Sequence, residues 1–410
     1  MIVRRHLLAL ACVPFLACAA AENTGGSTGG SKGTGTGGSK GTGGSTGITG
    51  LGMGGPFTFP QNKASGACTL TTVANAASAT STAYSSWKST YVTSNGAPSG
   101  AVRVQDPQTL SCAGTSVSNG TVSEGMGYGM LAAVYMGDQS TFDQLLAYVN
   151  AHLDSKGLMN WCINSGGTTV GQFSASDADE DIIWALLMAS DQWNSTSYLT
   201  TAQNMIAVMK ANSLFSDGTL QNGDNANTGD MLNPDYFSPA YYRVFATATA
   251  DTFWSTFVID ENYKRLAKAS GSYGLVPDEI TLENTSLQPN YTYDACRTPW
   301  RIAMDYCFNG EPRALTYLQL IGPFFNNIGA ANIGDGYSPS GSQTSGNHNM
   351  AFIGTAGVAG MAGWSNLTDG AFNFGVSNPG NGNDAYFPQS LRVVTMLMMS
   401  GNFLDYTQLR

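Results

Sequence analysis

Apolar residues recur about every three to four positions along most of the chain, and stretches in which apolar and polar residues alternate are few. Loops rich in Gly, Asn, Ser and Pro separate the periodic segments. The spacing predicts helices over residues 71–92, 124–136, 140–153, 177–193, 198–212, 237–248, 251–269, 297–308, 311–328, 347–361 and 387–400. The pattern therefore predicts an all-α domain of about a dozen helices.

An even set of helices joined by long loops favours a toroid, in which pairs of helices pack around a ring. An irregular helical bundle fits the same pattern. In both arrangements, loops on a rigid scaffold are the usual carriers of functional groups. We therefore expect the ligand site where loops and helix ends converge on a cleft.

Residues 1–21 have the composition of an export signal. Two basic residues, Arg4 and Arg5, precede an apolar run that is too short to span a bilayer, and small residues follow. We expect cleavage near Ala19–Ala21 and a secreted bacterial protein. The triplet Leu16-Ala17-Cys18 also resembles a lipoprotein cleavage box, which leaves a lipid anchor at Cys18 as the alternative. No other stretch of the sequence predicts a membrane span.

Residues 22–55 differ in composition from both their neighbours. They repeat Gly-Gly-Ser and Lys-Gly-Thr units and contain no large apolar residue before Ile48. Such a segment cannot bury enough surface to order itself, so it predicts a flexible tether. We expect one folded domain over residues 56–410.

The charge of the chain excludes some classes of partner. There are 18 Lys and Arg residues against 28 Asp and Glu residues. Neither nucleic acid nor anionic lipid fits this acidic balance, because both attract basic surfaces. Charged residues make up only 11% of the chain, which favours a neutral, hydroxyl-rich ligand. We expect the protein to be a monomer.

The cysteines do not indicate a metal site. Two of the seven lie in the signal, and the others are Cys68, Cys112, Cys162, Cys296 and Cys307. Five is an odd number and no Cys-x-x-Cys occurs, so neither a zinc site nor a complete disulfide framework is predicted. Cys68 and Cys112 are the pair we expect to bridge in an oxidising compartment, and buried free thiols fit the other three.

The common catalytic motifs are missing from the sequence. There is no Gly-x-Gly-x-x-Gly, P-loop or His-Glu-x-x-His, and no Gly-x-Ser-x-Gly accompanies the two histidines outside the signal, His152 and His348. The sequence therefore gives little support to a histidine-based triad or to a metal bound by histidines. We expect no cofactor and no metal, and carboxylates are the catalytic groups that remain.

Three carboxylates stand at predicted transitions from loop to helix: Glu124 in SEGMGYG, Asp177 in SASDADED and Asp294 in YTYDACRTPWR. Acidic residues at such positions often only cap the helix or complement its dipole. We interpret Asp179, Glu180 and Asp181 in that way. The first three are candidates for acid–base chemistry.

Glu124 has the most unusual setting of the three. Gly125, Gly127 and Gly129 are poor helix formers but allow another group to approach the backbone closely. Tyr128 and the neighbouring methionines would raise the pKa of the carboxyl group by desolvation, whereas a helix N-terminus would lower it. A raised pKa suits a general acid near neutral pH. The sequence alone does not decide between the two effects.

Aromatic residues gather in or beside the same segments: Trp161, Tyr236, Phe237, Tyr241, Tyr242, Tyr291, Tyr293, Trp300, Tyr337 and Tyr386. We expect about half of them to pack in the core. The others can stack on sugar rings, and Tyr386 is a candidate for contact with substrate. Two carboxylates with aromatic side chains around them form the set that glycoside hydrolysis requires.

Seven blocks in the same order resemble glycoside hydrolase family 8, over about residues 70 to 405. They are SEGMGYGMLAAVYMGDQSTFDQLLAYV, GLMNW, SDADEDIIWALLMA, NPDYFSPAYYRVF, YDACRTPWRIAMDY, DGYSPSG with NHNMAFIG, and QSLRVVTMLMMSGNF. The resemblance implies an (α/α)6 barrel. It also implies cleavage of a β-1,4-linked polysaccharide, such as cellulose, mixed-linkage glucan, xylan or chitosan, with inversion at the anomeric carbon.

The resemblance assigns roles to individual residues. It implies that Glu124 is the general acid and that Asp294 is the general base, with Arg297 beside it. We then interpret the glycines around Glu124 as room for the sugar chain. Asp177 corresponds to the residue that binds and distorts the sugar at the cleavage point.

Aromatic positions match the family as well. Tyr236 and Tyr293 match tyrosines near the distorted sugar, and Trp161 matches an aromatic platform further along the binding site. One position departs from the pattern. Many family cellulases carry a Trp shortly after a Gly-Asp pair, but here Gly223-Asp224 is followed by Asn225, Ala226 and Asn227.

This departure bears on the substrate and on the choice between functions. Cellulose or mixed-linkage glucan is the first expectation, with a xylanase or a chitosanase as the alternative. Outside this class of enzyme, a non-catalytic carbohydrate-binding protein or a surface protein is the remaining alternative.

Overall fold

The structure, a computed structural model, describes residues 55–225, 231–379 and 386–409. The predicted signal with Cys18, the tether up to residue 54, and Ala226 and Asn227 lie outside the described residues. The described ranges contain twelve α-helices: α1 (Ala76–Tyr91), α2 (Ser123–Tyr135), α3 (Gln139–Ala151), α4 (Ser176–Gln192), α5 (Thr196–Asn212), α6 (Pro239–Thr249), α7 (Ile259–Ala269), α8 (Thr298–Asn309), α9 (Pro312–Ile328), α10 (Met350–Gly360), α11 (Ser365–Ser377) and α12 (Tyr386–Met399). The predicted all-α class is confirmed.

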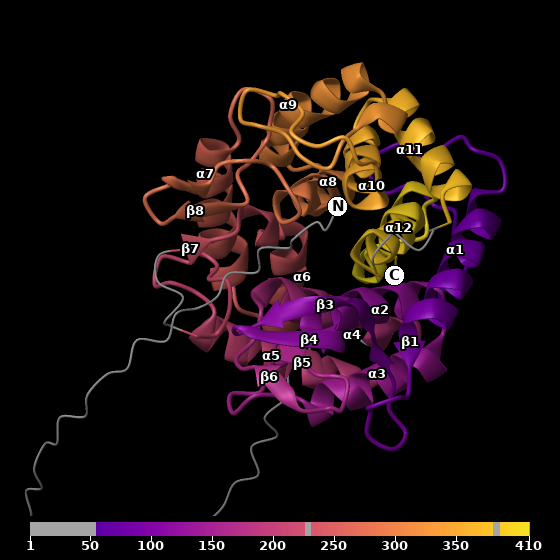
Figure 1. Cartoon of the computed structure of the whole chain (residues 1–410), viewed down its shortest axis with the longest axis vertical. Coiled ribbons are helices and arrows are strands. Elements are labelled where there is room, and N and C mark those ends of the chain that lie inside the picture. Colours follow the sequence, from indigo (N-terminus) through magenta and orange to yellow (C-terminus); the bar gives the residue numbers. More distant parts are fainter. Residues whose placement is uncertain (1–54, 226–230, 380–385, 410) are drawn as a thin grey trace, which may run out of the picture.

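The helices form two concentric rings (Figure 1). Each even-numbered helix from α2 to α10 contacts the next even-numbered helix, and α12 contacts α2, which closes the inner ring. The odd-numbered helices lie outside: α3 on α2, α5 on α4, α7 on α6, α9 on α8, α11 on α10 and α1 on α12. This is an (α/α)6 barrel, and the predicted toroid is confirmed over the irregular bundle.

Burial explains which helices lie inside. Every residue of α4 from Ser176 to Gln192 is buried, and the same holds for α10 and α12. A helix that is apolar on most of its circumference can bury that surface only when other elements surround it. The outer helix α3 buries a single stripe that includes Phe142, Leu145 and Val149. Among the described residues, no helix has both the length and the apolar character needed to cross a membrane.

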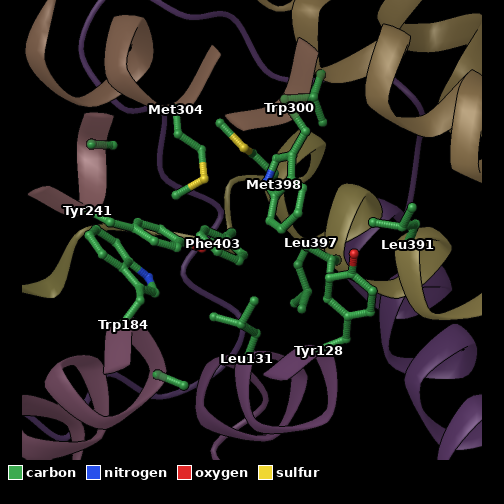
Figure 2. Packing of buried hydrophobic residues seen from close by; sticks show 14 of the residues in the cluster. Tyr128, Leu131, Trp184, Tyr241, Trp300, Met304, Leu391, Leu397, Met398 and Phe403 are labelled. Carbon is green, nitrogen blue, oxygen red and sulfur yellow. The ribbon is translucent and has the colours of Figure 1, made fainter. Parts of the chain in front are cut away.

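The centre of the barrel is filled by large side chains (Figure 2). Tyr128 of α2 packs on Trp300 of α8 with the ring centroids 6.2 Å apart, and Trp184 of α4 stacks on Tyr241 of α6 at 4.4 Å. Aromatic pairs of this kind add to the free energy gained from burying their area. The barrel therefore has a packed core, and its functional groups lie at one end.

Nine short strands accompany the helices in the described ranges: β1 (Val92–Thr93), β2 (Arg103–Val104), β3 (Asp106–Cys112), β4 (Thr115–Val122), β5 (Cys162–Ile163), β6 (Thr169–Gly171), β7 (Met231–Leu232), β8 (Glu279–Thr281) and β9 (Ser286–Gln288). They form three antiparallel sheets, β1-β2, β3-β4-β5-β6 and β7-β8-β9. The sequence signals for these strands are weak because the longer ones are polar and half-exposed. β4 runs directly into α2 and so fixes where Glu124 begins its helix.

One helix was not predicted. α11 contains Gly370 and Gly375, and glycine lowers intrinsic helix propensity. A Cβ atom on Gly370 would lie 2.9 Å from Cβ of Ala330, so this position has no room for a side chain. The close contact of α11 with its neighbours, which a local pattern does not report, outweighs its poor propensity.

The predicted disulfide between Cys68 and Cys112 is wrong. Cys68 is bonded to Cys307 and Cys112 to Cys162, while Cys296 is a buried free thiol. The first bridge joins the segment before α1 to the end of α8, and the second joins β3 to β5. Both partners come from far along the chain, so spacing in the sequence gave no sign of them.

The interpretation of Glu180 and Asp181 as simple helix-start residues is also wrong, whereas Asp179 does lie in the first turn of α4. All three are fully buried, and no side chain caps the N-terminus of α4. Glu180 accepts hydrogen bonds from Ser238 Oγ at 2.7 Å and Tyr242 OH at 2.6 Å. These bonds join α4 to α6 across the inner ring.

Asp181 joins α4 to α8 in a similar way. It forms a two-point ion pair with Arg301, whose Nη2 lies 2.8 Å from Asp181 Oδ2, and accepts a hydrogen bond from Tyr241 OH at 3.0 Å. Buried carboxyl groups require such partners, because an isolated charge in the core costs several kcal/mol. Glu180 and Asp181 therefore connect α4 to α6 and α8 within the inner ring.

Candidate active site

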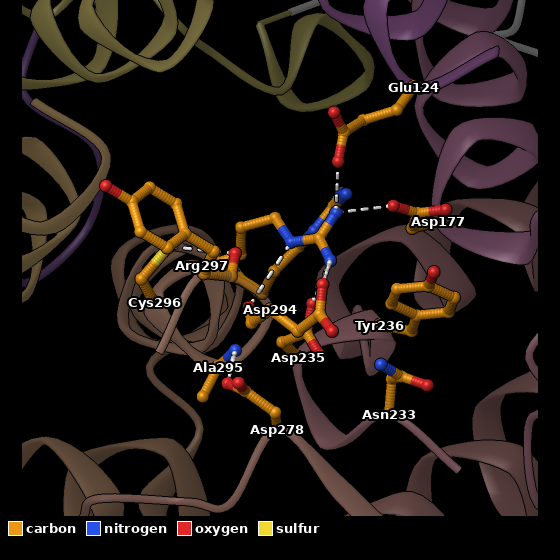
Figure 3. A network of polar contacts seen from close by, with 12 residues as sticks. Glu124, Asp177, Asn233, Asp235, Tyr236, Asp278, Asp294, Ala295, Cys296 and Arg297 are labelled. Carbon is orange, nitrogen blue, oxygen red and sulfur yellow. Dashed lines mark hydrogen bonds and ion pairs between the residues drawn. The ribbon is translucent and has the colours of Figure 1, made fainter. Parts of the chain in front are cut away.

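The candidate site lies where the inner helices begin, around the guanidinium group of Arg297 (Figure 3). Glu124 and Asp177 are the second residues of α2 and α4, and Tyr386 is the first residue of α12. Arg297 closes a short 3-10 turn, η4 (Ala295–Arg297), immediately before α8. The predicted positions of the candidate carboxylates at transitions from loop to helix are confirmed.

One nitrogen of Arg297 binds two of the candidate carboxylates. Nη1 lies 2.6 Å from Glu124 Oε2 and 2.6 Å from Asp177 Oδ2. The Arg297 side chain is only 2% exposed. A buried guanidinium with two charge-assisted hydrogen bonds from one nitrogen holds the starts of α2, α4 and α8 together.

The other nitrogen binds Asp294 and a carboxylate that the sequence reasoning missed. Nη2 lies 3.3 Å from Asp294 Oδ1 and 2.6 Å from Asp235 Oδ2. Asp235 lies in the 3-10 turn η2 (Pro234–Tyr236), and its side chain is fully buried. The signal was present, because Asp235 is in the NPDYFSP block, directly before Tyr236. Its importance becomes visible only when Arg297 is seen beside it.

Four carboxyl groups therefore surround one positive charge. If all four were ionised, the group would carry a net charge of −3 at a mostly buried position. Like charges in such a site raise one another's affinity for protons. Burial raises the pKa of Asp235 well above its usual range, and the charge of Arg297 opposes this only in part.

Arg297 remains charged in this environment. Burial alone would lower the pKa of its guanidinium group, but Asp235, Asp177 and Glu124 together raise it well above the usual value. The rings of Tyr236 and Phe387 lie 5.2 and 5.8 Å from its central carbon. Arg297 is thus a permanent cation that orients the carboxyl groups.

Glu124 is held from a second side by Tyr386. The Tyr386 hydroxyl donates a hydrogen bond to Glu124 Oε1 at 2.8 Å. Gly125 permits this contact, since a Cβ atom there would lie 2.9 Å from Cε2 of Tyr386. The first turn of α2 therefore needs a glycine beside the carboxylate.

The interpretation of the α2 glycines as room for a sugar chain is wrong. A Cβ atom on Gly127 would lie 2.9 Å from Cβ of Asp181 in α4, and one on Gly129 would lie 3.0 Å from Val104. The partners that approach the helix are the protein's own side chains. Close packing of α2 against α4 and β2 explains these two glycines.

Asp294 is the most exposed of the four carboxylates, with 42% of its side chain accessible. The turn that carries it is fixed by Asp278, whose Oδ1 accepts hydrogen bonds from the backbone N–H of Thr292 at 2.8 Å and of Ala295 at 2.9 Å. The Asp294 carboxylate therefore faces solvent from a rigid turn.

The aromatic candidates fall into two groups. Trp161, Tyr236 and Tyr293 are half-buried, whereas the other seven, Phe237, Tyr241, Tyr242, Tyr291, Trp300, Tyr337 and Tyr386, are buried, which is more than the expected half. Tyr293 donates a hydrogen bond to Asp335 Oδ2 at 2.6 Å. Trp161 is tied to the start of α2, because its carbonyl accepts a hydrogen bond from Ser123 N at 3.0 Å.

The described residues contain no group of three or more His, Cys, Asp and Glu side chains arranged to hold a metal ion. The chemistry that this arrangement supports is proton transfer between carboxyl groups and a neutral substrate. It provides two accessible carboxyl groups, a fixed cation and half-buried aromatic rings.

Comparison with known proteins decides the family. The sequence model of the glycosyl hydrolases of family 8 matches residues 57–401. The chain belongs to this family. The family 8 enzyme is 41% identical over 330 residues to endoglucanase 2 of Ruminiclostridium josui, covering 77% of this chain and 70% of the relative. It is 33% identical over 359 residues to a beta-glucanase of Niallia circulans, covering 79% and 84%.

A solved structure agrees with the assignment. The apo structure of a beta-1,3-1,4-glucanase from Paenibacillus sp. X4 is similar to this family 8 enzyme with a TM-score of 0.76 and 29% identity, over 85% of this chain and 98% of that one. The protein is a glycoside hydrolase of the endoglucanase type.

Proposed function

We propose that this family 8 enzyme is a secreted endo-β-1,4-glycanase that inverts the anomeric configuration. Glu124 is the general acid and Asp294 the general base. The observation that carries this assignment is exposure: of the four carboxyl groups on Arg297, the side chains of Glu124 and Asp294 are 17% and 42% accessible. Those of Asp177 and Asp235 are 4% and 0% accessible, so neither is open to the attacking water.

The proposed reaction uses the two exposed groups on opposite sides of the sugar. Glu124 gives its proton to the departing glycosidic oxygen, while Asp294 takes a proton from the water that attacks the anomeric carbon. Inverting glycosidases hold the two carboxyl groups about 6.5–9.5 Å apart so that this water fits.

Asp177 has a separate part in the proposal. Its Oδ2 is bound to Arg297, and its Oδ1 is buried without a hydrogen bond among the described residues. A sugar hydroxyl at that oxygen would satisfy it, and the bond would count most as the ring distorts in the transition state. Tyr236 and Tyr293 would lie beside the same sugar, and Trp161 and Tyr386 would add contacts around it.

The substrate we propose is cellulose or mixed-linkage β-glucan. The names of the relatives, an endoglucanase and two β-glucanases, support a glucan. Xylan and chitosan are the alternatives, since the segment after Asp224 lacks an aromatic residue. Release of reducing sugar from each of the four polysaccharides by the domain over residues 56–410 decides between them.

We propose export followed by action outside the cell as a monomer, with residues 22–55 as a tether. The two disulfides support an oxidising compartment, because such bonds rarely persist in the cytosol. Mass spectrometry of the amino terminus of the protein from its own cells separates cleavage near Ala19–Ala21 from a lipid anchor at Cys18.

Replacement of the two exposed carboxylates tests the catalytic assignment. We expect E124Q and D294N each to lower kcat by about 10²–10⁴-fold, the usual contribution of a positioned acid or base. Binding of the polysaccharide and the melting temperature should stay near those of the wild type. D260N changes a surface carboxylate and is the matched control. Hydrolysis that survives E124Q would remove Glu124 from the mechanism.

The stereochemistry is tested by proton NMR of the sugar as it is released. Inversion at a β linkage gives the α anomer first, before mutarotation. A β anomer as the first product would indicate retention, which requires carboxyl groups about 5–5.5 Å apart. If no polysaccharide of the panel gives any product, the non-catalytic surface protein becomes the better description.

A further inference from the structure

Phe173, an exposed aromatic residue in a strained conformation, lies near the candidate site and has no part in the mechanism above. It stands between β6 and α4 with φ of 70° and is 38% exposed. Eight non-glycine residues in the described ranges have positive φ, of which five are Asn and two are Ala. Phe173 is the eighth and the only large one. This region of backbone conformation is unfavourable for a bulky side chain, so the fold holds Phe173 there against its own preference.

Backbone hydrogen bonds fix where Phe173 lies relative to the catalytic centre. Ser123 N, beside Glu124, donates to the carbonyl of Trp161 at 3.0 Å, and Trp161 N donates to the carbonyl of Phe173 at 2.8 Å. Adjacent strands lie about 5 Å apart, so Phe173 is about two strand spacings, ~10 Å, from the start of α2. A short oligosaccharide spans such a distance.

Polar partners fix the segment around the ring. Lys156 Nζ lies over the Phe173 ring, 5.4 Å from its centroid, and forms an ion pair with Asp224 Oδ2 at 3.2 Å. Phe173 N donates to Asn160 Oδ1 at 3.1 Å, and Ser174 N donates to Asp224 Oδ1 at 3.0 Å. The exposed ring is therefore held in place before any ligand arrives, which lowers the entropy lost on binding.

The surroundings of Phe173 indicate what it binds. Trp161 is half-buried, and its ring packs against Gly171, where a Cβ atom would lie 2.3 Å from Cε2 of the indole. Trp161 and Phe173 are thus neighbouring aromatic groups, flanked by an amide and an ammonium group. No aromatic residue occurs between Gln221 and Met231, on the other side of Asp224. A flat apolar ring bordered by hydrogen-bonding groups suits the face and the hydroxyls of a pyranose unit.

We propose that Phe173 is a sugar-stacking platform that extends the binding site beyond Trp161 and binds a distant pyranose unit of the polysaccharide chain. The inference rests on the proposed function, since it requires a β-linked polysaccharide as substrate. In this proposal, the unfavourable backbone conformation of Phe173 directs its ring toward the substrate chain.

Steady-state kinetics on long and short substrates tests the platform. On a soluble β-glucan polymer we expect F173A and F173G to raise KM about tenfold, with the change in KM rather than kcat, because a distant contact contributes equally to the ground and transition states. On the shortest oligosaccharide that the enzyme cleaves, KM should not change. F173W and F173Y should keep KM within about twofold of the wild type.

Two further variants separate the ring from the backbone strain and from general effects of the surface. F173G relieves the unfavourable φ whereas F173A keeps it, so F173G should melt at a higher temperature than F173A while both lose the ring. F257A removes the most exposed of the large hydrophobic side chains, on the outer ring, and should leave KM unchanged. An unchanged KM for F173A on the polymer, or an equal change on the shortest substrate, would overturn the proposal.

A binding experiment keeps the platform testable if hydrolysis fails. Affinity electrophoresis in gels that contain soluble β-glucan should show weaker retardation of E124Q/F173A than of E124Q. Absence of turnover in the wild type would refute the proposed function, and equal retardation of the two variants would refute the platform. The two failures are therefore distinguishable.

Discussion

At the scale of single residues, Arg297 determines how the carboxyl groups of the site are arranged. The sequence places it beside Asp294. Its Nη1 instead contacts Glu124 and Asp177 at 2.6 Å, closer than the 3.3 Å contact of Nη2 with Asp294. A planar guanidinium group offers several donors in fixed directions, which a lysine ammonium group does not.

R297K should therefore be strongly impaired although it preserves the charge. We expect kcat/KM to fall about 100-fold, since misplacing a catalytic group by about 1 Å has an effect of this size. The free energy of unfolding should decrease by about 3–5 kcal/mol, because buried carboxylates lose their partner. R313K, at a side chain 42% exposed, is the control and should change little. Near-normal kinetics of R297K would mean that a positive charge at this position is enough and that the planar guanidinium group is not required.

At the scale of elements, the starts of four of the six inner helices, α2, α4, α8 and α12, supply parts of the site. Glu124, Asp177 and Tyr386 occupy the first or second position of α2, α4 and α12. Helix N-termini carry partial positive charge and favour carboxylates there. Closing the helices into a ring brings these termini together, so groups that are distant in sequence become neighbours.

The contact between α4 and α6 should make stability depend on pH. Burial raises the pKa of Glu180 to about 8 in the folded protein. Between pH 5 and 8 the folded protein holds a proton that the unfolded chain has released, since an exposed Glu has a pKa of about 4.3. The contribution of Glu180 to stability therefore decreases as pH rises through this window.

The variant E180Q should remove this part of the pH dependence, because an amide mimics the protonated carboxyl group. Melting temperatures at pH 5, 6.5 and 8 should decline for the wild type by several degrees, at about 2–4 °C per kcal/mol, and decline less for E180Q. E283Q, which changes an exposed carboxylate, should follow the wild type. Parallel declines for all three proteins would contradict a buried protonated Glu180.

At the scale of the whole molecule, the two disulfides act on different parts of the barrel. Cys307 lies ten residues after Arg297 in the chain, about 15 Å along α8 at 1.5 Å per residue. Its bridge to Cys68 therefore ties the segment before α1 to the end of the barrel away from the site. The bridge between Cys112 and Cys162 is next to Trp161 and supports the side of the barrel that carries the candidate site.

Removing the first bridge should affect stability and leave the chemistry intact. We expect C68A/C307A to lose about 2–5 kcal/mol of unfolding free energy, as is usual for a disulfide, with kcat at 25 °C near that of the wild type. Denaturant unfolding with and without dithiothreitol measures this, and the reductant should destabilise the wild type more than C68A/C307A. Equal stability of both proteins in the absence of reductant would show that the bridge contributes nothing.

Much of the fold follows from local patterns in the sequence. Eleven of the twelve helices in the described ranges overlap predicted segments, because apolar residues at helical spacing mark a buried face regardless of what covers it. α11 was not predicted because its glycines lower the local helix propensity. Its formation depends on contacts with neighbouring elements. The individual strands were not predicted because they are short and polar.

The candidate site was predicted in its residue types and only partly in its arrangement. Glu124, Asp177, Asp294 and Arg297 come together as expected. Asp235 was missed, since an aspartate after Pro resembles an ordinary turn residue until Arg297 is placed beside it. Glu180 and Asp181 were misinterpreted because burial on all sides of a helix is a property of the ring.

The sequence by itself determined which segments become helices and which residue types are available for acid–base chemistry, because helical spacing and side-chain chemistry are local. Only the tertiary structure decided which cysteines pair, which four carboxyl groups share Arg297, and which two of them reach solvent. These depend on contacts between residues far apart in the chain. Ring closure creates those contacts, and no periodic pattern within one segment encodes them.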